Sequence, residues 1–89
     1  MPLAIALKYE EGIDSAPVVI AKGKDYVARK IKEVAHEHRI EIVENKPLAQ
    51  ALYNLCEVDE EIPTEFYQAV ADILVYVYRQ KNYRREGSR

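Results

Sequence analysis

Hydrophobic and polar positions divide the first half of the chain into strand, helix and strand. Residues 17–21 form a short apolar run closed by Gly23, the pattern of a strand buried on both faces. From 24 to 38 the apolar residues recur at helical spacing, at Val27, Ile31, Val34 and Ala35. A second strand follows at 40–43. The segment 16–45 therefore predicts a right-handed βαβ crossover with parallel strands.

The segments on either side add one strand and one helix. Residues 3–9 are apolar and extended in character, and the polar loop 10–15 can return the chain antiparallel into 17–21. After the crossover, Asn45 suits a helix N-cap and Pro47 suits a first helical turn. An amphipathic helix is then indicated by Leu48, Ala51, Leu52 and Leu55.

A last helix starts after Pro63 and carries two adjoining apolar stripes. One stripe comprises Phe66, Val70, Ile73, Leu74 and Val77, and the other comprises Tyr67, Ala71, Leu74 and Tyr78. Such a face is broader than one contact surface needs. The pattern predicts an α/β (α+β-like) domain over 1–82, with a flexible basic tail over 83–89. Its small mixed sheet of about three strands is packed by three helices, in the order β-β-α-β-α-α.

Composition narrows the class of protein. The chain of 89 residues is one domain, and its net charge of −2 favours neither a nucleic-acid binder nor a membrane-surface protein. A lone cysteine, Cys56, fits a reducing compartment, and no apolar run reaches the length of a membrane span. These features predict a cytosolic protein. Its one acid-only segment, a candidate docking patch for a basic partner, contains Glu57, Asp59, Glu60 and Glu61, followed by Glu65.

The residues that carry chemistry form no catalytic constellation. His36 and His38 are two apart on a helix and point to nearly opposite sides, so a shared metal is not expected. Cys56 has no histidine at a local spacing, and the strand-to-helix turn at Lys22 has a single Gly, too few for a phosphate-binding loop. We therefore expect no metal, no cofactor and no catalytic residue.

Several segments in order and spacing nevertheless resemble a known family. They are 4–9 (Ala-Ile-Ala-Leu-Lys-Tyr), 16–23 (Ala-Pro-Val-Val-Ile-Ala-Lys-Gly), 43–53 (Val-Glu-Asn-Lys-Pro-Leu-Ala-Gln-Ala-Leu-Tyr), 61–63 (Glu-Ile-Pro) and 69–78 (Ala-Val-Ala-Asp-Ile-Leu-Val-Tyr-Val-Tyr). From Leu3 to Lys81 the chain resembles the C-terminal cytoplasmic domain of FlhB, the substrate-specificity switch of the flagellar and type III secretion export apparatus. The resemblance implies a cytosolic sheet wrapped by helices.

The resemblance also implies a self-cleaving Asn-Pro-Thr-His loop before the first strand, and here the chain departs from the family. In register, Leu3 follows the motif, Pro2 falls on its His and Met1 on its Thr. Self-cleavage therefore cannot be assigned to any residue, and the chain is expected not to be an enzyme. Two explanations stay open, a stand-alone FlhB-like protein and a fragment of a longer one; the start at Met1 favours the first.

The resemblance further implies a docking pocket for export substrates at Ala16, Pro17, Ala71 and Leu74. The implied partners are hook- or rod-type substrates, the hook-length control protein and other export-gate components, met in the cytoplasm beside the membrane export gate. Two alternatives remain. The first is a small ligand-binding protein or enzyme that uses Lys22, His36 or Cys56. The second is a regulatory mimic that competes with the authentic switch for its partners.

Overall fold

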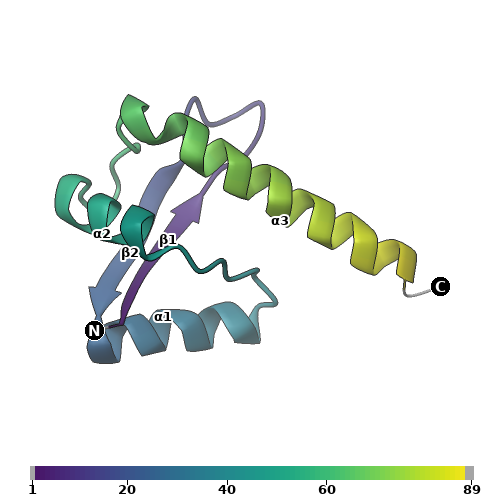
Figure 1. Cartoon of the computed structure of the whole chain (residues 1–89), viewed down its shortest axis with the longest axis horizontal. Helices are drawn as coiled ribbons and strands as arrows, with labels where there is room; N and C mark the ends of the chain where they lie inside the picture. The colour runs from purple at the N-terminus through teal and green to yellow at the C-terminus, as the bar shows by residue number, and fades with distance from the viewer. Residues whose placement is uncertain (1, 88–89) are drawn as a thin grey trace.

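A two-stranded antiparallel hairpin lies at the centre of the computed structural model, which describes residues 2–87 and, for side chains, residues 2–82 (Figure 1). The elements in chain order are β1 (Leu3–Lys8), β2 (Val18–Lys24), α1 (Asp25–Glu37), α2 (Lys46–Leu55), the 3-10 turn η1 (Thr64–Phe66) and α3 (Tyr67–Gly87). The domain is thus a small α/β fold with three helices, as expected, but its sheet has two strands.

The hairpin is closed by a side chain from its own loop. Asp14 Oδ2 accepts a hydrogen bond of 2.7 Å from the backbone N–H of Glu10 and lies 3.3 Å from Lys8 Nζ. Pairing then runs from Lys8 opposite Val18 to Leu3 opposite Lys24, with a bulge at Ile20. Ile20 is 49% exposed, so the prediction of a strand buried on both faces is wrong at this residue.

The two faces of the hairpin differ in side-chain size because they meet different helices. Ile5 and Leu7 pack on the cluster formed with α2 and α3, whereas Ala4 and its partner Gly23 are buried on the other face. There α1 contacts both strands, and Ala28 is fully buried. A Cβ added at Gly23 would overlap the side chain of Val27. Small residues on this face therefore let α1 approach the sheet closely.

The predicted strand at 40–43 is wrong, and with it the βαβ crossover over 16–45. After α1, the chain turns through Arg39 at a φ of 56°, and the Ile40 N–H bonds the carbonyl of Ala35 at 2.8 Å. The segment up to Asn45 is irregular and joins no strand in the described part of the chain. Within residues 2–87 the order is therefore β-β-α-α-α, without parallel strands. An apolar run cannot reveal whether a neighbouring edge is available for pairing.

The acidic connector takes part in backbone pairing that its sequence does not indicate. The Val19 N–H donates to the carbonyl of Glu60 at 2.9 Å, and the Asp59 N–H donates to the carbonyl of Val19 at 2.7 Å. A third bond of 2.9 Å joins the Ile62 N–H to the carbonyl of Pro17. The connector therefore covers the outer edge at the start of β2 and brings the acidic segment beside Ala16 and Pro17.

The core lies between the hairpin, α2 and the start of α3. Its buried residues are Val19, Leu52, Cys56, Ile62 and Val70, with Ile5, Leu7, Leu48, Phe66 and Leu74 packed against them. The predicted cap of α2 is confirmed, because Asn45 Oδ1 accepts from the Leu48 N–H at 3.1 Å. Beyond the core, the C-terminal half of α3 projects away from the hairpin (Figure 1). Of the predicted tail over 83–89, the described residues include the helical backbone up to Gly87; the rest lies outside them.

Candidate functional site

One face of α3 is apolar and open to solvent. Tyr67 is 42% exposed, Val75 49% and Tyr78 67%, and Ala71 between them is also exposed. With the half-buried Leu74, these residues fall within an arc of about 100° on a helix of 3.6 residues per turn. We call this surface the α3 strip: Tyr67, Ala71, Leu74, Val75 and Tyr78. It contains the second stripe that the sequence pattern indicated, and four of its five residues remain exposed after core packing.

The four residues expected to form the docking pocket lie at different depths. Ala71 is exposed and Leu74 is half-buried against the core, whereas Ala16 is 2% exposed and Pro17 is buried. Pro17 is joined to the core residue Ile62 by the backbone bond described above. Ala16 and Pro17 are therefore out of a partner's reach, and Ala71 is the most exposed member of the set.

The acidic residues lie at the same end of the hairpin as the first turn of α3 (Figure 1). Glu61 Oε2 accepts a hydrogen bond of 2.7 Å from Ser15 Oγ, and Glu60 Oε1 accepts one of 2.8 Å from the Glu57 N–H. Glu57 also lies 3.4 Å from Lys22 Nζ. The acidic patch is thus held in place by its own turn and by the β1–β2 loop.

Lys22, considered as a ligand-binding or active group, is engaged with α2. Its Nζ donates a 2.9 Å hydrogen bond to the carbonyl of Tyr53, in the last turn of the helix, and lies 4.9 Å from the centre of the Tyr53 ring. The side chain is 17% exposed. A lysine placed here satisfies a carbonyl that the helix itself leaves unpaired. Its geometry is that of a helix-terminating contact.

Cys56 is a member of the core. It is 1% exposed, and its thiol lies 3.4 Å from the carbonyl of Glu61 and 3.6 Å from that of Glu60, within reach to donate to either. Burial, followed by the neighbouring charge of Glu60, raises the pKa of the Cys56 thiol. Because the thiolate is the nucleophilic form, these surroundings make Cys56 a poor nucleophile.

The histidines line no metal site in the described residues. No group of three or more His, Cys, Asp or Glu side chains in that part of the chain is placed to hold a metal ion. His36 borders a shallow hollow of about 320 Å³ together with Arg39 and the following residues 40–42, and His38 follows the end of α1. Across the helices described, none is long and apolar enough to cross a membrane.

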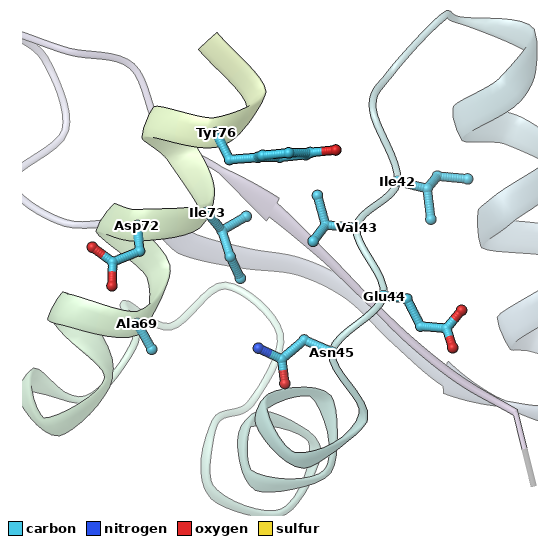
Figure 2. A pocket seen from close by; sticks show the side chains of 8 residues that line it. All are labelled: Ile42, Val43, Glu44, Asn45, Ala69, Asp72, Ile73 and Tyr76. Carbon is cyan, nitrogen blue, oxygen red and sulfur yellow. The ribbon is translucent and has the colours of Figure 1, made fainter. Parts of the chain in front are cut away.

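A larger groove, of about 510 Å³, runs along the other flank of α3 (Figure 2). One wall is the irregular segment 42–45 and the other is formed by Ala69, Asp72, Ile73 and Tyr76. Figure 2 shows Val43, Ile73 and Tyr76 projecting toward one another from the two walls. Neither hollow includes Ala16, Pro17, Ala71 or Leu74. The sequence pattern does not indicate this groove, because the groove arises where 42–45 runs past α3 without pairing.

The chain is similar to known proteins in sequence and in structure. The sequence model of the FlhB HrpN YscU SpaS family matches residues 1–77. The flagellar biosynthetic protein FlhB of Bacillus subtilis is 51% identical over 78 residues, and that of Salmonella typhimurium is 43% identical over 84 residues. These matches cover 88% and 94% of this chain, but 22% of each relative, so the chain spans less than a quarter of their length.

Solved structures agree with the sequence matches. The crystal structure of the cytoplasmic domain of FlhB from Shewanella putrefaciens superimposes with a TM-score of 0.90 at 44% identity, covering 94% of this chain and 69% of that one. The PscU C-terminal domain gives a TM-score of 0.81 at 33% identity, covering 84% and 95%. The chain belongs to the FlhB HrpN YscU SpaS family.

Proposed function

We propose that this chain is a non-enzymatic docking module of a flagellar or type III protein export apparatus, and that partners bind to the α3 strip. The observation that carries the proposal is the exposure of Tyr67, Ala71 and Tyr78 on one helix face. An exposed apolar face of this kind is typical of an interaction surface. Its similarity to the cytoplasmic domain of FlhB from Shewanella putrefaciens supports a position in the cytoplasm, and we place the module beside the membrane export gate as part of the proposal.

The strip suits a short apolar motif. Ala71 has a small side chain between two tyrosines, which leaves room for a partner side chain between their rings. Full burial of one large apolar side chain contributes about 2 kcal/mol. Two or three such anchors would give weak binding, which suits cargo that must be released after each delivery. The partners proposed are hook- or rod-type export substrates, the hook-length control protein and neighbouring export-gate components.

The absence of catalysis is part of the proposal and is supported by how the reactive side chains are used. Lys22 is bonded to the end of α2, and Cys56 is a buried thiol with a raised pKa. Both side chains are engaged in the fold, whereas a small enzyme that used them would need them free.

A pair of matched substitutions tests the proposal. Ala71→Glu places a charge on the strip, whereas Ala69→Glu places the same charge about 160° around the same helix, beside the groove. Both alanines are exposed, so neither change should disturb the core. We expect Ala71→Glu to weaken binding of a purified hook-type substrate at least about tenfold, the loss of one buried anchor contact, and Ala69→Glu to leave it unchanged. Thermal melting checks that both variants fold.

Unchanged binding by Ala71→Glu would remove the strip as the docking surface. Loss of binding in Ala69→Glu alone would move the docking surface to the groove between 42–45 and α3.

A further inference from the structure

The two ends of the α3 strip carry opposite charges. Glu61 and Glu65 precede its first residue, Tyr67, and Arg79 and Lys81 follow its last, Tyr78. All four charged side chains are exposed. From Tyr67 to Tyr78 the helix rises about 16 Å at 1.5 Å per residue. This separation exceeds the distance of about 8 Å over which charges are screened at physiological ionic strength, so a bound segment would meet the two ends separately.

The acidic end is not neutralised within the chain. Among the side chains of residues 2–82, Glu61 and Glu65 form no ion pair. The hydrogen bond that Glu61 accepts comes from the neutral hydroxyl of Ser15, which orients the carboxylate without cancelling its charge. Ser15 directly precedes Ala16, so the bond holds Glu61 beside the buried residues just before β2.

We infer that the α3 strip binds an amphipathic segment of its partner in one orientation, with basic side chains of that segment over Glu61 and Glu65. The apolar side chains of the segment lie along Tyr67, Ala71 and Tyr78. This inference rests on the proposed function of the strip and adds the charge and direction of the ligand. Complementary charge governs orientation and association rate more than final affinity, so apolar anchors hold the segment and the carboxylates select its direction.

Two synthetic peptides test the inference by fluorescence anisotropy. Each has about 16 residues, enough to cover the strip, and both carry the same Phe and Leu residues at helical spacing. One ends in Lys-Arg-Lys and the other in the neutral Gln-Gln-Gln. We expect the basic peptide to bind about tenfold more tightly at low salt, and this preference to shrink as the salt concentration rises.

Matched double variants show which carboxylates the basic peptide recognises. Glu61→Gln with Glu65→Gln should abolish the preference. Glu33→Gln with Glu37→Gln removes the same charge from exposed positions on α1, on the other face of the hairpin. This second double variant should keep the preference for the basic peptide. Equal binding of the two peptides, or an equal loss of preference in both double variants, would overturn this inference and leave the docking proposal standing. Failure of both peptides to bind would overturn the two together.

Discussion

Val27 occupies the space that a side chain at residue 23 would need: a Cβ built on Gly23 overlaps Cγ1 of Val27. We therefore expect Gly23→Ala to lower the free energy of unfolding by about 1–3 kcal/mol, the usual cost of forcing extra atoms into a packed contact. Urea denaturation measures the change. Val27→Ala removes the overlapping Cγ1 but keeps Cβ, which lies 2.6 Å from the added atom, so the double variant Gly23→Ala with Val27→Ala should recover only part of the loss. Equal destabilisation in the single and double variants would contradict this packing.

Lys22 is expected to stabilise the junction between β2 and α2. Lys22→Met keeps the aliphatic stem but removes the hydrogen bond to the Tyr53 carbonyl, so it should cost about 1–2 kcal/mol of unfolding free energy. Lys24→Met is the control, because Lys24 is exposed and lies over the same ring at 5.1 Å. Its cost should be about 0.5 kcal/mol. Similar costs for the two variants would show that the carbonyl contact contributes little.

Cys56 should make stability depend on alkaline pH. Because burial raises its pKa, the folded state keeps the thiol proton to higher pH than the unfolded state does. The stability that this proton supports is fully present below the ordinary pKa of a cysteine and is lost as pH rises through the raised one. Chemical denaturation of the chain and of Cys56→Ala over this range isolates the effect. The stability advantage of the cysteine should shrink as pH rises; a constant advantage would contradict the burial of a protonated thiol.

Local signals in the sequence located most elements. The hairpin, α1 and the Asn45 cap depend on residues close together in the chain, and all three are present in the structure. Two long-range features could not be found in this way. The run 40–43 has the composition of a strand but no paired edge, and the acidic connector pairs with Val19 through backbone groups that every residue type carries.

For the candidate site, too, the sequence indicated local features but not those that depend on distant segments. The surplus of apolar residues on α3 was visible as a second stripe, because helical spacing alone places Tyr67, Ala71 and Tyr78 together. The depth of Ala16 and the groove beside 42–45 depend on how distant segments pack. The bond between Ser15 and Glu61 spans 46 positions and has no local signal at all.

The proposal that partners bind on the α3 strip can be tested residue by residue. The most direct measurement is a titration of the isotopically labelled chain with a purified hook-type export substrate, followed by nuclear magnetic resonance. We predict that the largest shifts fall on the backbone signals of Tyr67, Ala71 and Val75. Shifts confined to the groove, at Val43, Ile73 and Tyr76, would contradict the claim.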